Sequence, residues 1–241
     1  LNVEIGELMQ TRDLSMHPFV KWAGGKTQLL DRLIALMPKD YKDYYEPFIG
    51  GGALFFKVKP RHPHINDMND ELLSAYRCFL KKDTCERLMA KLDEYDRNHS
   101  EENYLIVRAL DKDQNWQANA DDVERAARMI YLNKACFNGL FRVNSKGFFN
   151  VPSGKKKTVN AYDKVNFINV LGYFSISKPV ITHEDFSKAV KNAKSGDFVY
   201  FDPPYDTWDD KSSFTSYDKE GFGKKDQARL ADCFRELDKK G

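Results

Sequence analysis

A tetrapeptide near the end of the chain combines a carboxylate, a carbonyl in a rigid backbone and an aromatic ring. Asp202-Pro203-Pro204-Tyr205 directly follows the apolar run at residues 198–201. The prolines fix φ at about −65° and push Asp202 to extended geometry, so its carboxylate and the Pro203 carbonyl hold one relative orientation. Both groups accept hydrogen bonds, which matches the two hydrogens of an exocyclic amine such as adenine N6. The pattern predicts methylation of such an amine, with Tyr205 stacking on the base; a proline turn that only caps a strand is the structural alternative.

Short strands and turns would position this tetrapeptide. The apolar run at residues 198–201 predicts a central strand, and ligands of open α/β sheets bind outside the carboxyl ends of the strands. Residues 44–46 predict another short strand, which leads into a glycine turn at 47–52 and a helix that opens at 53–57. Residues 64–67 predict the next strand, with an acid at its end. This is a strand, turn and helix unit of the kind that binds nucleotides.

The glycine turn suits a nucleoside. Gly50 and Gly52 allow a ligand to approach the backbone closely, although Phe55 occupies the place of the third glycine in a dinucleotide fingerprint. Asp67 follows about one strand-helix unit later, where a carboxylate accepts hydrogen bonds from ribose hydroxyls. A tight turn with a purely structural role is the alternative.

Helical periodicity divides the rest of the chain. Residues 71–136 are helical almost throughout, and residues 148–152 predict the second arm of a hairpin. Strand signals return at 179–182, and further helices are predicted at 26–37 and 224–239. We therefore expect an α/β domain interrupted by a helical block, with parts at residues 1–69, 70–166 and 167–241.

The composition predicts a globular protein with a hydrophobic core. Its 241 residues are 41% hydrophobic, and no apolar stretch approaches the roughly 20 residues that a membrane-spanning helix needs. The polar N-terminus has no signal-peptide pattern, so we expect a cytoplasmic protein. No metal is expected, because His62 and His64 lack partners to complete a ligand set and the cysteines form no C-x-x-C pair. The cysteines are Cys78, Cys85, Cys136 and Cys233.

The charge distribution predicts a nucleic-acid partner more clearly than the net charge of +2 does. Residues 93–124 carry ten acids and three basic residues, whereas residues 125–160 carry eight basic residues and no acid. Such an abrupt switch is typical of a basic face that binds DNA or RNA. A solvated basic surface without a partner is the alternative on charge alone.

Four blocks of sequence occur in the order found in Dam-type DNA adenine methyltransferases with the alpha-group motif order. They lie at residues 19–26, 45–53, 137–142 with 149–152, and 202–205. The chain resembles this family from about Phe19 to its end. The resemblance implies S-adenosylmethionine as methyl donor, N6 of adenine as acceptor and GATC as the recognised site, with no metal. An RNA adenine is an alternative acceptor.

The resemblance also implies a fold and a donor site. The fold would be α/β, a Rossmann-like S-adenosylmethionine-dependent methyltransferase domain with an inserted, mainly helical DNA-recognition domain. Methyl transfer would be direct, to an adenine flipped out of the duplex, and the catalytic residues would be Asp202, Pro203 and Tyr205. The donor pocket would be lined by Trp22, Lys26, Glu46, Phe48, Gly50, Gly52, Asp67, Asp185, Phe186 and Asp202.

The helical insertion would recognise double-stranded DNA, with Phe137 entering the base stack. The residues predicted to contact DNA are Lys21, Phe137, Asn138, Gly139, Leu140, Arg142 and Pro152, together with Lys155, Lys156 and Lys157 at phosphates. Four of these predictions have structural alternatives, namely Phe137 as a core residue, Asn138-Gly139 as a plain turn, Arg142 as a surface charge and the lysine segment as a solvated loop.

Two departures from the family pattern affect these expectations. The loop at residues 206–213 carries three acids where the family has a proline- and serine-containing loop. The family also continues with further strands, and the first residue is Leu1 rather than methionine, so we expect a fragment whose C-terminal strands are missing. The alternative function is therefore a non-catalytic or truncated, inactive DNA-binding homologue. A monomer or weak dimer is expected, and the biological role, for example restriction-modification, stays open.

Overall fold

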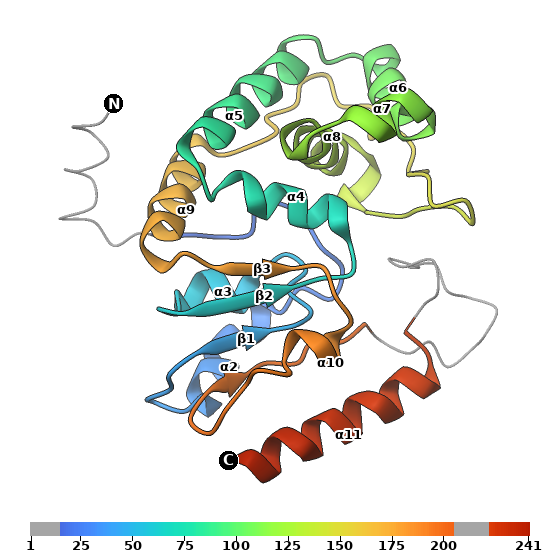
Figure 1. Ribbon diagram of the computed structural model, residues 1–241. Helices are drawn as coiled ribbons and strands as arrows, with labels where there is room; N and C mark the ends of the chain where they lie inside the picture. The colour runs from blue at the N-terminus through green and yellow to red at the C-terminus, as the bar shows by residue number, and fades with distance from the viewer. Residues whose placement is uncertain (1–14, 205–221) are drawn as a thin grey trace.

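The computed structural model describes residues 15–204 and 222–241 of the chain. It contains a four-stranded sheet in the order β3-β2-β1-β4, in which every pairing is parallel (Figure 1). Because parallel strands end on the same side, the loops that follow all four strands meet at one end of the sheet. The predicted α/β class is confirmed. The strands are β1 (Tyr44–Glu46), β2 (Pro63–Asn66), β3 (Val180–Thr182) and β4 (Phe198–Val199).

Successive side chains of β1 point to opposite faces of the sheet. Tyr44 belongs to the main hydrophobic core, where its ring lies 6.4 Å from that of Phe55. Tyr45 packs on the other face, in a smaller cluster with Val190 and side chains of the last helix. Helices α2 (Leu30–Leu36), preceded by the 3-10 helix η1 (Thr27–Leu29), and α3 (Ala53–Val58) cover the first face, and α10 (Phe186–Ala189) and α11 (Lys224–Lys240) the second (Figure 1).

Within the described residues, the apolar run at residues 198–201 lies at an edge of the sheet rather than in a central strand as predicted. Only Phe198 and Val199 are assigned to β4, both are half-buried, and within the described residues the strand pairs with β1 alone. Side chains rather than a second strand border its other side, in an apolar groove lined by Leu33, Leu36 and Phe234, among others. An apolar run does not show by itself whether a strand pairs on one edge or on both.

A helical layer lies above the sheet (Figure 1) and confirms the predicted helical block. Its central helix is α8, which begins with a capping box between Asp121 and Glu124 and packs against three of the other helices. Nearly all of α8 is buried, as expected for the middle of a bundle. The layer consists of α4 (Asp70–Cys78), α5 (Lys82–Arg97), α6 (Glu101–Ala109), η2 (Leu110–Lys112), α7 (Gln114–Asn119), α8 (Asp122–Ala135) and η3 (Phe137–Gly139).

Helix α9 (Lys164–Ser177) was not expected from the sequence. Asp163 caps its N-terminus by accepting hydrogen bonds from the backbone N–H groups of Val165 and Asn166. Its apolar residues are spread around all of its faces, which hides the helical period. The helix packs against α5, and the hydroxyl of Tyr173 donates to the Pro60 carbonyl at 2.7 Å. The boundary expected after residue 166 falls inside this helix.

The expected hairpin before α9 is present as isolated bridges rather than as a regular ladder. Val143 pairs with Phe149, and Cys136 pairs with Ser153. The turn between the arms is closed by a hydrogen bond of 2.9 Å from the Asn144 N–H to the Phe148 carbonyl. This irregular hairpin lies directly after the turn at η3, so it brings residues 142 and 150 next to each other.

Candidate functional site

Glu46 ends β1 inside the protein. Its side chain is 3% exposed, and the hydroxyl of Tyr44 donates to it at 2.5 Å. Burial raises the pKa of Glu46 to about 8; the Asp202 and Asp67 carboxylates act in the same direction, and the Tyr44 hydrogen bond opposes them. The Asp202 and Asp67 carboxylates therefore lie close enough to Glu46 to act on its charge, which favours the binding of a cation.

The turn after β1 needs its glycines for structural reasons. Gly50 and Gly52 have φ values of +47° and +70°. A Cβ on Gly50 would lie 2.7 Å from Trp22 Cδ1, and one on Gly52 would lie 2.6 Å from the Tyr76 hydroxyl. That hydroxyl donates to the Gly50 carbonyl at 2.9 Å. The purely structural alternative is sufficient for both glycines, and the close packing also brings Trp22 to the loop, as expected.

Asp67 joins the loop after β2 to the loop after β1. One carboxylate oxygen accepts from the Gly50 N–H and the other from the Asn69 N–H, each at 2.9 Å. Burial raises the pKa of Asp67, while the hydrogen bonds from Asn69 and Gly50 act against this shift. Asp67 thus lies beside the glycine turn at the carboxyl end of the sheet, where a ribose-binding acid was predicted.

Asn66 is a buried residue of this site that the sequence analysis missed. Its amide nitrogen donates to the carbonyls of Pro47 and Glu184 at 3.0 and 2.9 Å. Its oxygen accepts from the Thr182 hydroxyl and the Glu184 N–H, both at 2.9 Å. One amide therefore joins the loops after β1 and β3, which only a side chain with donors and acceptors can do. A polar residue ending a buried strand was the available signal.

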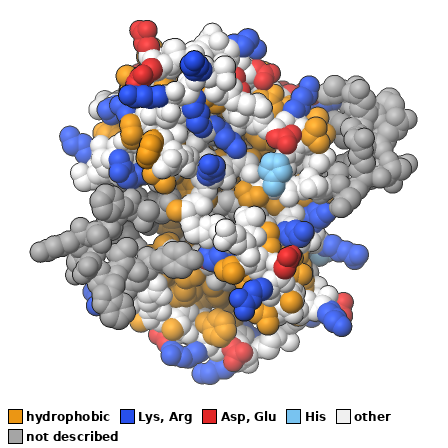
Figure 2. Space-filling view, turned by 180° about the vertical axis from the view of Figure 1, so that it is seen from behind, with side chains coloured by type: hydrophobic (Ala, Val, Ile, Leu, Met, Phe, Trp, Pro, Cys, Tyr) orange, Lys and Arg blue, Asp and Glu red, His pale blue; other side chains and the backbone are white. Residues whose placement is uncertain are grey.

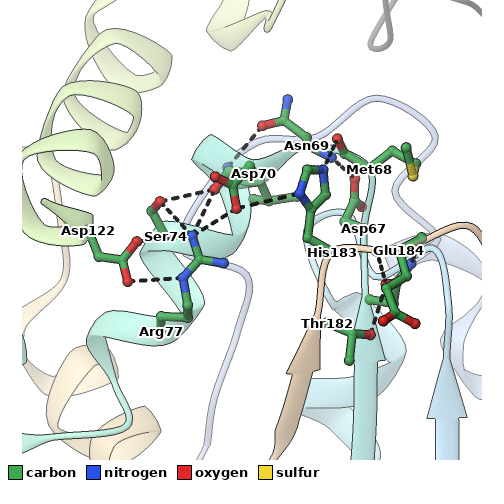
Figure 3. Close-up of polar contacts among 12 residues, drawn as sticks. Asp67, Met68, Asn69, Asp70, Ser74, Arg77, Asp122, Thr182, His183 and Glu184 are labelled. Carbon is green, nitrogen blue, oxygen red and sulfur yellow. Dashed lines mark hydrogen bonds and ion pairs between the residues drawn. The ribbon is translucent and has the colours of Figure 1, made fainter. Parts of the chain in front are cut away.

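The loops after β2 and β3 also contact each other directly. Figure 3 shows His183 pointing to the loop that carries Asp67, and His183 Nε2 lies 3.1 Å from the Met68 carbonyl oxygen. Behind this contact, Arg77 binds the carboxylates of Asp70 and Asp122 at 2.9 Å each. The ion pairs connect α4 to α8, so the acid-bearing loop rests on the helical layer.

Three aromatic side chains, Phe48, Phe186 and Phe222, pack together beside α10. The ring of Phe48 lies 5.5 Å from that of Phe186 and 5.6 Å from that of Phe222. Arg229 of α11 lies 5.0 Å above the Phe186 ring. Phe48 and Phe186 come together as predicted, whereas Phe222 and Arg229 were not anticipated, because both belong to a segment distant in sequence.

Asp185 is committed to contacts within the protein. It caps α10 through the Ser187 N–H at 3.0 Å and binds Arg229 at 2.8 Å. Although burial acts to raise it, the hydrogen bonds from Arg229 and Ser187 hold the pKa of Asp185 below its usual range. The structure places this residue at the predicted site, where it anchors α11.

Asp202 follows β4 and is paired with Lys26. Lys26 Nζ lies 2.5 Å from an Asp202 carboxylate oxygen and also donates to the Gly24 carbonyl at 2.7 Å. Both side chains of the ion pair are largely buried, so the interaction links the first sequence block to the Asp-Pro-Pro turn. Pro203 is half-buried beside it. Tyr205 lies outside the described residues.

The predicted DNA-contacting turn is exposed on the helical layer. Phe137 is 53% exposed, so it is not a core residue, and Asn138 takes up a left-handed conformation with φ +56°. Asn133, which the sequence analysis also missed, accepts from the Lys21 N–H at 2.8 Å. Its amide nitrogen donates to the carbonyls of Lys21 and Gly139 at 2.9 and 3.0 Å. Buried Asn133 and Gly139 thus carry the exposed side chains, which are Lys21, Phe137, Asn138 and Leu140.

The second group of predicted DNA contacts lies beside this turn. The Pro152 carbonyl accepts a hydrogen bond from the Phe137 N–H at 3.0 Å, so exposed Pro152 lies next to the backbone of Phe137. Arg142 is half-buried, and its Nε donates to the Asn150 side chain at 2.8 Å. The Arg142 side chain is therefore held by Asn150 and is not a freely moving surface charge.

The basic segment divides between surface and core. Lys155, Lys156 and Lys157 are exposed, and the Lys156 ammonium contacts the Lys134 carbonyl. Arg128 is only 1% exposed and pairs with acids inside the helical layer, so it does not belong to the predicted basic face. On the face shown in Figure 2, Lys and Arg side chains are spread over both halves, and apolar side chains gather in a hollow of the lower half.

No helix in residues 15–204 and 222–241 is long and apolar enough to cross a membrane. In the same described part of the chain, no three His, Cys, Asp or Glu side chains gather as a metal site would require.

The fold is α/β, and its predicted site residues lie at the carboxyl end of a parallel sheet, where the ligands of α/β enzymes bind. Residues 22–241 match the family described as D12 class N6 adenine-specific DNA methyltransferase. The chain belongs to this family of S-adenosylmethionine-dependent, adenine-specific DNA methyltransferases.

Several characterised relatives support this assignment. The chain is 47% identical over 234 residues to the type II methyltransferase M1.LlaDCHI of Lactococcus lactis subsp. cremoris, covering 97% of this chain and 81% of that protein. It is 40% identical over 245 residues to the type II methyltransferase M.MjaIII of Methanocaldococcus jannaschii, covering 95% and 82%. It is 30% identical over 233 residues to the DNA adenine methylase of Haemophilus influenzae, covering 94% and 77%.

Proposed function

We propose that the chain methylates N6 of adenine in GATC sites of double-stranded DNA, with S-adenosylmethionine as donor and the adenine flipped out of the duplex. The observation that carries this proposal is the convergence of Glu46, Asp67 and Asp202 at the carboxyl end of the sheet. The resemblance of residues 137–142 and 149–152 to the Dam-type recognition blocks supports GATC as the site.

The residues at the end of the sheet fit the donor. S-adenosylmethionine supplies an electrophilic methyl group on a positively charged sulfur. The carboxyls of Glu46 and Asp202 would stabilise that charge, since they lie in a buried site where charge interactions are strong. Asp67 would accept from a ribose hydroxyl, and the paired rings of Phe48 and Phe186 would hold the donor's adenine.

Asp202 and Pro203 would act on the acceptor. The carboxylate and the carbonyl would each accept one hydrogen of N6, which orients the nitrogen lone pair towards the methyl group and stabilises the positive charge that develops on N6. Lys26 would hold Asp202 in place through their 2.5 Å contact. The stacking role of Tyr205 stays a prediction, and transfer needs no covalent enzyme intermediate.

The exposed turn would bind the DNA. Phe137 would fill the space that the flipped adenine leaves in the stack, and Arg142 would read a guanine. Lys21, Asn138, Leu140 and Pro152 are also exposed, and the backbones of Leu140 and Pro152 are hydrogen-bonded to that of Phe137. Lys155 and Lys156 would contact phosphates without reading sequence.

A plasmid assay tests the proposal. Tritium transfer from labelled S-adenosylmethionine to plasmid DNA measures activity, and digestion with GATC cutters of opposite methylation sensitivity identifies the site. We expect labelled DNA that resists the enzyme blocked by adenine methylation and is cut by the enzyme that requires it. Labelled DNA with an unchanged GATC digestion pattern would contradict the site, and unlabelled DNA would contradict the activity.

A further inference from the structure

Arg142 and Asn150 are joined by two hydrogen bonds. Arg142 Nε donates to the Asn150 side-chain oxygen at 2.8 Å, and the Asn150 N–H donates to the Arg142 carbonyl at 3.0 Å. Within residues 15–204 and 222–241, Nε is the one guanidinium nitrogen of Arg142 with a hydrogen-bond partner. Asn150 was not among the residues predicted to contact DNA, and none of the contacts described so far gives it a role in recognition.

The position of this hydrogen bond decides which edge of the guanidinium is available. Arginine carries five N–H groups in a rigid plane, and it can offer either its Nε side or its Nη1–Nη2 end to a two-acceptor partner. With Nε occupied by Asn150, the Nη1–Nη2 end is left for an outside partner. The O6 and N7 acceptors of guanine fit such a pair of donors.

The arm that carries Asn150 is fixed to the core. The neighbouring Phe149 N–H donates to the Asp111 carboxylate at 2.6 Å, and the same carboxylate lies 2.6 Å from buried Arg128. Arg128 also binds Glu71 of α4 at 2.8 Å. Because this ion network belongs to the interior of the helical layer, Asn150 is a fixed point against which the flexible arginine side chain is oriented.

We propose that Asn150 determines base specificity as a positioning residue, by holding Arg142 so that its Nη1–Nη2 end faces the major groove. Asn150 itself needs no contact with a base. Its hydrogen bond removes rotamer freedom from Arg142 before DNA arrives, so less entropy is lost when the correct base is bound. This inference rests on the proposed function, because it assumes that Arg142 reads a guanine.

The test compares kcat/KM for methyl transfer on the GATC duplex and on duplexes with one base pair substituted. Arg142→Ala should lose most of the discrimination at one base pair, roughly 5- to 150-fold. Asn150→Ala should lower discrimination at that same base pair roughly 3- to 10-fold, as expected for one hydrogen bond. In the Arg142→Ala background, Asn150→Ala should have no further effect on discrimination, since the two side chains act as a unit.

Two further variants separate positioning from folding. Asn150→Asp keeps an acceptor for Nε, so discrimination should be retained even if the added negative charge weakens binding to all duplexes. Asn144→Ala loosens the hairpin turn, where the Asn144 side chain accepts from the N–H groups of Lys146 and Phe148, but does not touch Arg142. It should leave discrimination unchanged.

The outcomes are distinct. If Asn144→Ala relaxes the same base pair as Asn150→Ala, the effect comes from the hairpin as a whole and the inference is wrong. If Arg142→Ala relaxes one base pair and Asn150→Ala relaxes none, the inference is also wrong but the proposed reading by Arg142 stands. If neither variant changes discrimination, the assignment of Arg142 in the proposed function fails.

Discussion

Glu46 shows how much a single carboxyl depends on its surroundings. It is buried at the end of β1, its pKa is raised to about 8, and its charge interacts with those of Asp202 and Asp67. Placing a cationic donor among these groups favours their ionised forms, so the same burial that costs stability strengthens donor binding. A strongly shifted carboxyl in such a place is typical of a functional site.

The shift of Glu46 predicts a pH dependence of stability. Between its ordinary pKa of 4.5 and about 8, Glu46 is protonated in the folded state and ionised in the unfolded state. The folded state therefore binds more protons, and the free energy of unfolding falls as pH rises across this window. Glu46→Gln should remove this part of the slope in urea denaturation. The exposed-acid control Glu184→Gln should keep the wild-type slope, and an unchanged slope in Glu46→Gln would show that the carboxyl is not shifted.

At the scale of elements, the turn at η3 exposes Phe137 to solvent, and buried Asn133 and Gly139 hold this turn in place. Phe137→Ala should impair base flipping more than duplex binding, because the inserted ring offsets part of the few kcal/mol lost when adenine leaves the stack. A 2-aminopurine at the target position brightens on unstacking and measures this directly. We expect a smaller or slower rise in the variant than in the wild type with DNA and a donor analogue.

Stability measurements provide the control for Phe137. Because the side chain is 53% exposed, Phe137→Ala should change the free energy of unfolding by less than about 1 kcal/mol. Buried Phe141→Ala should cost about 3–5 kcal/mol. A fluorescence rise of equal size and rate in Phe137→Ala and wild type would mean that the ring does not enter the stack.

The helical layer depends on a buried ion network. Arg128 binds Glu71 and Asp111 and also donates to the Val107 and Arg108 carbonyls. Arg128→Met should lower the free energy of unfolding by about 3–5 kcal/mol, because it leaves carboxylates unpaired in the interior.

Thermal and urea denaturation measure the effect of Arg128→Met against a matched control. Arg87→Met removes an exposed ion pair with Asp121 and should leave stability nearly unchanged. Equal effects of the two substitutions would show that the network does not organise the layer.

At the scale of the whole molecule, a segment of exposed lysines at residues 155–157 follows the exposed turn at η3. Lys156→Ala should weaken binding to all duplexes alike and reduce the slope of log K against log salt by about one phosphate contact. Fluorescence anisotropy over a range of salt concentrations measures both effects. The control Lys57→Ala changes an exposed lysine of α3, on the sheet side, and should leave the slope unchanged. A uniform loss of affinity without a change in slope would mean that Lys156 does not contact phosphate.

Much of the fold could be predicted because its strands and helices follow local sequence patterns. The strands at 44–46, 64–67 and 179–182 were recognised to within a residue or two, since each is a short apolar run bounded by turn residues. Helix α9 was missed because its apolar residues surround the helix. The position of β4 at an edge of the described sheet could not be predicted, because an apolar pattern does not identify the neighbours of a strand in space.

The residues missed at the site share one chemistry. Asn66, Asn133 and Asn150 each hold a functional loop through an amide that donates or accepts across the fold. Their roles depend on tertiary contacts between segments distant in sequence or across a turn, which neither spacing nor composition reveals. The charged and aromatic residues of the same loops were found because their side chains carry recognisable chemistry.

The most direct test of the account concerns Asp202, which ends β4 and pairs with Lys26. Purified wild type and Asp202→Ala are incubated with S-adenosylmethionine and GATC duplex, and N6-methyladenine is quantified by mass spectrometry of the digested nucleosides. Duplex affinity is measured in parallel. We predict N6-methyladenine from the wild type, none from Asp202→Ala at saturating donor, and duplex affinities within a few fold of each other. Substantial N6-methyladenine from Asp202→Ala would contradict the assigned role of the carboxylate, and its absence from the wild type would contradict the proposed activity itself.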